Sequence, residues 1–152
     1  MSAKLDIRRD DALGPDALGL IGKSEVELAS IYPPEVRYAF SPQELLDAGV
    51  VFVVGYQDQE PVACGGIALL DGYAELKRVF VDETVRGQGL AGQIVGSLED
   101  LARDQQRAMM RLETGEASPD AIRAYQKLGY HRRGPFGAYE ENGSSVFMEK
   151  AL

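Results

Sequence analysis

The chain has 152 residues, 45% of them hydrophobic and 26% charged, which is ordinary for a globular protein. Its formal net charge of −8 argues against a nucleic-acid partner, because phosphate backbones favour clustered Lys and Arg. One cysteine, Cys64, excludes an intramolecular disulfide, and with one histidine, His131, it disfavours a metal site. We expect one domain over residues 1–152, no membrane partner and a cytoplasmic location, because no apolar run suits a span or a signal segment.

The N-terminal third is expected to combine a short strand with broken helices. Residues 4–9 alternate apolar and charged side chains, which is typical of a half-buried strand. Residues 12–31 have apolar side chains at helical spacing, but glycines interrupt them, so one or two broken helices are predicted. Ser41 and Pro42 are typical of a helix start, and Gly49 is expected to end that short helix.

The middle of the chain predicts a β-meander followed by a crossover. Residues 50–56, 62–70 and 73–81 are rich in β-branched and aromatic residues and are separated by turn signals. A helix is expected over residues 89–107. The strand that follows it, at residues 109–113, should run parallel to the third strand of the meander, because a helical crossover precedes it.

The C-terminal part predicts one more helix and two strands. Ser118 and Pro119 begin the helix, and Gly129 after Leu128 suits a left-handed cap. Strands are expected near residues 130–133 and 144–149. The complete order indicates an α+β domain, since a doubly wound sheet would alternate strand and helix from its start.

The segment Leu76–Gly92, LKRVFVDETVRGQGLAG, has the form of a phosphate-binding loop that leads into a helix. Glycines let the main chain approach a ligand, and the first N–H groups of a helix attract anions. Gly87-Gln88-Gly89-Leu90-Ala91-Gly92 fits the G-x-G-x-x-G spacing of dinucleotide-binding units, with Glu113 about 20 residues further on as the ribose-binding acid. This pattern predicts an NAD-binding oxidoreductase.

The same segment fits a second pattern. Arg86-x-x-Gly89-x-Ala91 resembles the R/Q-x-x-G-x-G/A signature of the GNAT superfamily of N-acetyltransferases. Ala121-x-x-x-Tyr125-x-x-x-Gly129-Tyr130 is similar to a second motif of that family, at the expected distance. The turn between the strand and the first glycine, together with the α+β order, favours this second interpretation.

The resemblance to GNAT proteins extends from about residue 50 to residue 152. It implies a mixed, mostly antiparallel central sheet flanked by helices, and direct acetyl transfer from acetyl-CoA to an amine, which we expect to belong to a small molecule. Strand backbone would bind the pantetheine arm, and the glycine loop would bind the pyrophosphate. Ser118 stands where many relatives have an asparagine, and the alternative role for it is a helix cap. The implied cofactor-binding residues are Val79, Val81, Arg86, Gly87, Gln88, Gly89, Leu90, Ala91, Ser118 and Ala121.

Two residues are candidates for the catalytic groups. Glu75 falls where several GNAT proteins carry a catalytic glutamate, and the two-residue strand period predicts that it shares a face with Lys77, Val79 and Val81. As a general base it would need a raised pKa; the alternative is an ion-pair partner of Lys77 or of an arginine. Tyr125 resembles the family's general acid, and the alternative is an aromatic packing residue.

Other assignments stay open at this level. A non-catalytic acyl-CoA binding or sensing module would need the same loop but no base or acid. Arg86 would bind phosphate or, alternatively, pair with an acid on the surface. Tyr32, Phe136 and Tyr139 would line the acceptor pocket or belong to the core. A homodimer is possible.

Overall fold

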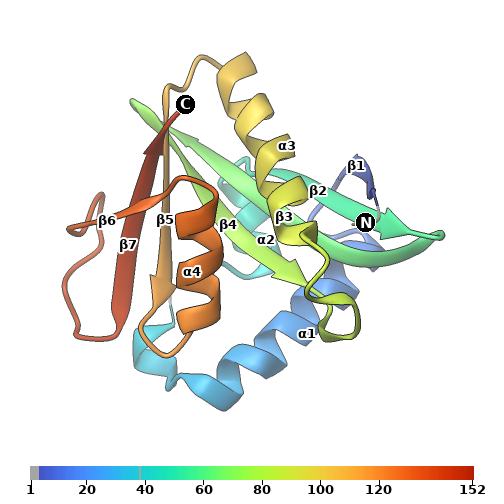
Figure 1. The fold of residues 1–152 in the computed structure, drawn as a ribbon, viewed down its shortest axis with the longest axis horizontal. Helices are drawn as coiled ribbons and strands as arrows, with labels where there is room; N and C mark the ends of the chain where they lie inside the picture. Colours follow the sequence, from blue (N-terminus) through green and yellow to red (C-terminus); the bar gives the residue numbers. More distant parts are fainter. Residues whose placement is uncertain (1–3, 38) are drawn as a thin grey trace.

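The computed structural model describes residues 4–37 and 39–152, and these form one seven-stranded sheet flanked by helices (Figure 1). The strand order is β1-β2-β3-β4-β5-β7-β6, and every neighbouring pair is antiparallel except β4–β5. The strands are β1 (Asp6–Asp10), β2 (Val51–Gln57), β3 (Glu60–Leu70), β4 (Tyr73–Val81), β5 (Met109–Gly115), β6 (His131–Arg133) and β7 (Ser145–Ala151). The helices are α1 (Pro15–Ile31), α2 (Pro42–Asp47), α3 (Leu90–Asp104) and α4 (Pro119–Lys127), with short 3₁₀ turns η1 (Pro34–Val36) and η2 (Glu83–Val85). The predicted α+β class, the mixed sheet and the parallel β4–β5 pair are confirmed.

The predicted break in the first helix is wrong, because α1 is one continuous helix of 17 residues. Gly19 and Gly22 lie where an added Cβ would meet nothing within 4 Å, so they face away from the packed side. Each costs roughly 1 kcal/mol relative to alanine. Burial of Leu20 and Ile21 against the sheet offsets this cost, and tertiary packing thus overrides the local signal.

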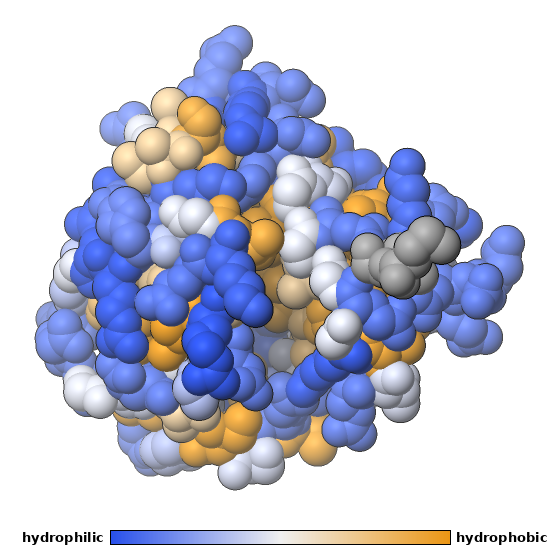
Figure 2. All heavy atoms as spheres, viewed as in Figure 1, coloured by the Kyte–Doolittle hydropathy of each residue, from blue (hydrophilic) through white to orange (hydrophobic). Residues whose placement is uncertain are grey.

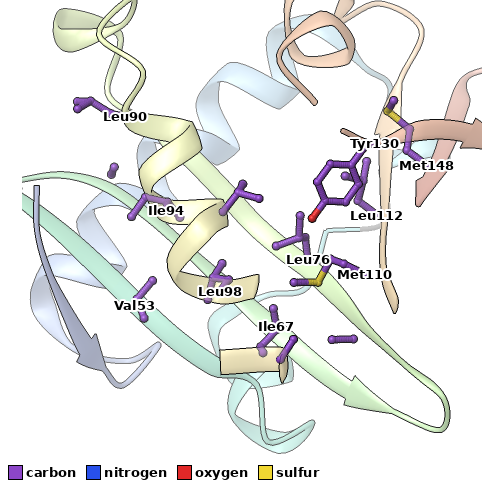
Figure 3. Packing of buried hydrophobic residues seen from close by; sticks show 14 of the residues in the cluster. Val53, Ile67, Leu76, Leu90, Ile94, Leu98, Met110, Leu112, Tyr130 and Met148 are labelled. Carbon is purple, nitrogen blue, oxygen red and sulfur yellow. The ribbon is translucent and has the colours of Figure 1, made fainter. Parts of the chain in front are cut away.

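Two hydrophobic clusters cover the two faces of the sheet. On one face, α3 packs the fully buried side chains of Leu90, Ile94 and Leu98 against the strands (Figure 3). On the other face, α1 and α2 contribute Leu20 and Leu45 to a second cluster. Hydrophilic side chains cover most of the surface in Figure 2, and hydrophobic atoms show only in separate patches. None of the helices in residues 4–37 and 39–152 combines the length and apolar character that a membrane span requires.

Strands β4 and β5 diverge soon after they meet, and this opens the sheet (Figure 1). Their pairing is limited to Ala74 with Met110 and Glu75 with Arg111. Beyond these pairs the edge of β4 that faces β5 has backbone N–H and C=O groups without a neighbouring strand. Such an edge can bind an extended chain by strand-like hydrogen bonds.

A β-bulge in β4 changes which face of the sheet the later side chains of this strand lie on. Lys77 pairs with Gly66 and Phe80 with Cys64, so Arg78 and Val79 both lie opposite one residue of β3. The extra residue reverses the alternation of side chains beyond the bulge. Glu75 and Lys77 therefore lie on one face, while Val79 and Val81 pack with the α3 cluster on the other. The expectation that all four share a face is wrong, because the two-residue period does not continue through the bulge.

Candidate active site

A cleft of about 220 Å³ occupies the opening between β4 and β5. Helix α1, the segment after it, helix α4 and the loop between β6 and β7 complete its walls. The polar side chains that line it include Glu75, Lys77, Arg78, Glu113, Tyr125 and Tyr139. The fold thus brings the two predicted catalytic residues, Glu75 and Tyr125, into one cavity with Val79, Ser118 and Ala121.

Glu75 is held by two hydrogen bonds from its surroundings. Its carboxylate accepts one from Lys77 Nζ at 2.9 Å and one from the hydroxyl of Tyr139 at 2.5 Å. Glu75 and Lys77 are only 4% and 8% exposed, so this is a buried ion pair. Burial and the adjacent Glu75 carboxylate raise the pKa of Tyr139, so its hydroxyl stays a donor. The alternative raised from the sequence, an ion pair with Lys77, is present, and both partners come from β4.

Glu113 on β5 is a second carboxyl group in the cleft, and the sequence interpretation missed its place there. Its Oε2 atom accepts a hydrogen bond from Ser145 Oγ at 2.7 Å. Burial, with a contribution from the negative charge of Glu75, raises the pKa of Glu113 to about 7, although Ser145 and Lys77 oppose the shift. A signal for it existed: β5 runs parallel to β4, and an acid in its last residues falls where the strands separate.

Tyr125 lies on the α4 wall of the cleft and also packs against the core. Its ring meets that of Tyr130 edge-on at 5.8 Å between centroids. Burial raises the pKa of Tyr125 to about 12, so the hydroxyl keeps its proton at neutral pH. Tyr125 is therefore a packing residue that also lines the cleft, and its role as the general acid stays a prediction.

Ser118 is the N-cap residue of α4, and its carbonyl oxygen accepts a hydrogen bond from Ile122 N at 3.1 Å. Its side chain makes no capping hydrogen bond. Instead the hydroxyls of Ser118 and Tyr32 share a hydrogen bond of 2.7 Å, which ties the end of α1 to the start of α4. Ser118 thus occupies the expected N-cap position, but its side chain does not cap the helix.

The three aromatic residues expected at the acceptor pocket separate into two groups. Tyr32 and Tyr139 line the cleft. Phe136 is not among the residues that line the cleft, and its ring is in edge contact with Tyr73, Tyr139 and Phe147. The pocket wall thus has two tyrosines, of which Tyr139 packs against Phe136.

The glycine loop before α3 has the backbone that a phosphate site requires. Gly87 has φ +84°, and Gly89, the N-cap of α3, has φ +75°. A Cβ at either position would meet nothing within 4 Å, so the loop is open on its outer side. The N-cap is a glycine without a capping side chain, and the first N–H groups of a helix have no partner within the helix and attract anions. The role of this loop as a pyrophosphate site stays a prediction.

The side chains of residues 86–91 are not among those that line the cleft, and each has different neighbours. Arg86 donates to the carbonyl oxygen of Val81 at 2.9 Å and pairs with Glu27 of α1 at 2.6 Å. Gln88 accepts a hydrogen bond from Gln57, and Leu90 is buried in the core. The phosphate role of Arg86 stays a prediction.

Cys64 and His131 lie away from the cleft chemistry. Cys64 is fully buried, and burial raises the pKa of its thiol to about 12. His131 is on the outside of β6, with its side chain 67% exposed. Neither residue offers a nucleophile or a base to the cleft.

Comparison with known proteins agrees with this geometry. The model of the acetyltransferase (GNAT) family matches residues 20–130. A protein of Azospirillum brasilense named IAA acetyltransferase is 35% identical over 148 residues, covering 96% of this chain and 97% of that protein. The Bacillus subtilis protein YsnE, named as an uncharacterized N-acetyltransferase, is 26% identical over 97% of this chain and all of its own.

Solved structures agree on the fold. A Klebsiella pneumoniae structure assigned to the acyl-CoA N-acyltransferases superposes with a TM-score of 0.83 at 31% identity, covering 97% of each chain. The PaiA N-acetyltransferase of Thermoplasma acidophilum, in complex with coenzyme A, has a TM-score of 0.75 at 17% identity over 99% of this chain and 100% of that one. The family match disfavours the alternative of an NAD-binding oxidoreductase. The chain belongs to the GNAT family of acetyltransferases, and its cosubstrate is acetyl-CoA.

Proposed function

We propose that this acetyltransferase acts on the amine of a small molecule that enters the cleft between β4 and β5. The observation that carries the proposal is the meeting of two carboxyl groups and a tyrosine hydroxyl in one cavity, beside an open strand edge. The cavity of about 220 Å³ suits a small acceptor. A sensing module would need the open edge but not this set of proton donors and acceptors.

The residues that would hold acetyl-CoA follow the open edge and the glycine loop. The backbone of Val79 and Val81 suits the pantetheine arm, and the backbone of residues 87–91 suits the pyrophosphate. Arg86, Ser118 and Ala121 complete this proposed set. Acetyl-CoA, when bound, supplies a thioester whose acetyl carbon accepts the amine and whose sulfur departs.

The cleft must also remove a proton from the acceptor. Glu75 was the base predicted from the sequence, but Lys77 and Tyr139 already donate to its carboxylate. Glu113 accepts a side-chain hydrogen bond from Ser145 and from no other side chain in the described part of the chain, and its pKa of about 7 lies near neutral pH, as a general base requires. We therefore propose Glu113 as the proton acceptor and Glu75 as the group that fixes Lys77 and Tyr139.

Tyr125 is the proposed proton donor. Its pKa of about 12 keeps it protonated at neutral pH, and it faces the cleft from the wall opposite the strands. The proton that it gives up to the departing group would be regained from solvent between turnovers.

A thiol-release assay with acetyl-CoA and a panel of amines tests the function. We expect release of free coenzyme A that depends on the amine, and an acetylated amine in equal amount by mass spectrometry. Tight binding of acetyl-CoA by calorimetry, with no release for any amine, would instead identify a sensing module.

The homodimer, the cytoplasmic location and the lack of nucleic-acid or membrane partners stay predictions.

Replacing Gly89 with valine is expected to raise the dissociation constant for coenzyme A about tenfold, or about 1.4 kcal/mol. The side chain would strain a backbone with φ +75° and crowd the approach of the pyrophosphate. Isothermal titration calorimetry measures the constant. Gly72→Val is the matched control, because Gly72 has φ +82° and open space but lies in the β3–β4 turn. Equal loss of affinity in both variants would contradict the proposed pyrophosphate site.

A further inference from the structure

One wall of the cleft is rich in cations. Arg37 comes from the segment after α1, and Lys77 and Arg78 come from the bulged part of β4. Lys77 is satisfied by Glu75 and Tyr139, and its ammonium lies 4.0 Å from the centre of the Phe40 ring. The two arginines differ from it, because each has donor groups that no described residue uses.

Arg37 is a half-buried guanidinium in the cleft wall with no side-chain partner among residues 4–37 and 39–152. Its Nε atom is shielded from solvent and makes no hydrogen bond. Buried arginine donors are normally paired with carboxylates, carbonyl groups or phosphates, since leaving them unpaired is unfavourable. Arg37 also makes no ion pair with a described residue, so its charge has no carboxylate partner in that part of the chain.

Arg78 has the same property in a more constrained setting. Its side chain is 2% exposed; Nε donates to the carbonyl oxygen of Phe40 at 2.8 Å, and one terminal nitrogen pairs with Glu25. The other terminal nitrogen, Nη1, is shielded and has no partner in the described residues. Arg78 also has φ +56°, a strained conformation for a residue with a side chain, and such strain often occurs at functional sites.

We propose that the acceptor carries a carboxylate that binds at Arg37 and Arg78, so that the substrates are amino acids or similar compounds. A guanidinium matches a carboxylate by paired N–H donors. The amine of the same molecule would then face the acidic side of the cleft at Glu113 and Glu75. A cleft with both signs of charge on its walls suits a molecule that itself carries both. This inference rests on the proposed amine acetylation and specifies its substrate class.

Matched pairs of acceptors test the proposal. The panel contains the amino acids phenylalanine, leucine and lysine, each with its decarboxylated amine: phenethylamine, isopentylamine and cadaverine. For at least one of the three pairs, we expect kcat/KM for the amino acid to be tenfold or more above kcat/KM for its decarboxylated amine. Amines that match or exceed all three amino acids would overturn the proposal and leave the acetyltransferase function intact.

The variant Arg37→Gln separates the acceptor site from the cosubstrate site. We expect KM for the preferred amino acid to rise at least tenfold, while KM for its amine and for acetyl-CoA stays unchanged. The control is Arg103→Gln, which removes a half-exposed arginine of α3 paired with Asp100, outside the cleft. A raised KM for acetyl-CoA in Arg37→Gln would show that Arg37 binds a coenzyme phosphate, and would overturn the proposal.

A binding experiment decides the case in which no amine is acetylated. Calorimetry of the protein loaded with coenzyme A, titrated with each of the three amino acids, needs no turnover. Binding that Arg37→Gln weakens tenfold would support the carboxylate site even if the proposed function failed. No measurable binding of any of the three, in a protein that binds coenzyme A, would overturn it. Melting temperatures within a few degrees of the parent protein confirm that the variants are folded.

Discussion

Replacing Glu113 with glutamine is expected to lower kcat/KM at pH 8 by roughly 10²- to 10⁴-fold, the usual contribution of a general base. The glutamine keeps the size of the side chain and can still accept the hydrogen bond from Ser145 Oγ. It cannot take up a proton. The loss should therefore appear in turnover with little change in the dissociation constant of coenzyme A.

The pH dependence of the parent protein follows from the same residue. The pKa of Glu113 is raised to about 7, so the carboxyl group is charged above pH 7 and protonated below it. Only the charged form accepts a proton, and kcat/KM should fall about tenfold for each pH unit below 7. In Glu113→Gln the limb with its midpoint near pH 7 should be absent, and the remaining rate should follow only the fraction of neutral amine across the whole range. Initial rates from pH 5.5 to 8.5 measure it.

Glu75→Gln is the comparison that separates the two carboxyl groups. The charge of Glu75 helps to raise the pKa of Glu113, whereas Lys77 lowers it. Removing the charge of Glu75 should therefore retain the acid limb and shift it to lower pH. If Glu75 is the base, as the sequence predicted, its substitution would remove the limb and Glu113→Gln would preserve it.

Local sequence signals predicted most of the fold because they coincide with tertiary packing. The meander over 50–81 has turn residues between β-branched runs, and the helix after Gly89 has its apolar stripe on the side that meets the sheet. At α1 the local sequence signal and the tertiary packing disagree. Its glycines predict a break, but they face open space and the other side of the helix is buried.

The site was harder to predict, because it depends on geometry that the period of a strand does not encode. The bulge at Arg78 changes the face of every residue after it, so Val79 and Val81 could not be placed by counting from Glu75. The partners of Glu75 come from its own strand and from a loop 64 residues away, and only the fold brings Tyr139 to it. Glu113 becomes a base candidate through burial and through Glu75, both of which are tertiary properties.

Replacing Tyr125 with phenylalanine is expected to lower kcat by roughly 10²-fold or more, within the range usual for a positioned acid. Phenylalanine retains the edge contact with the ring of Tyr130 and removes only the hydroxyl. The affinity for acetyl-CoA should hence stay near that of the parent protein, and kcat and kcat/KM should fall together. Stopped-flow detection of free thiol gives the rate, and calorimetry gives the affinity.

Tyr56→Phe is the matched control for the loss of a tyrosine hydroxyl. Tyr56 lies on β2, outside the cleft lining, and donates a hydrogen bond to Asp16. Its substitution should leave kcat unchanged. Since the pKa of Tyr125 is raised to about 12, the parent protein should keep its proton donor through pH 9. A loss of activity near pH 9 that is absent in Tyr125→Phe would contradict this, because the hydroxyl would then lose its proton at a lower pH than expected. Unchanged turnover in Tyr125→Phe would leave the departing sulfur to be protonated by water, and Tyr125 would then be a packing residue alone.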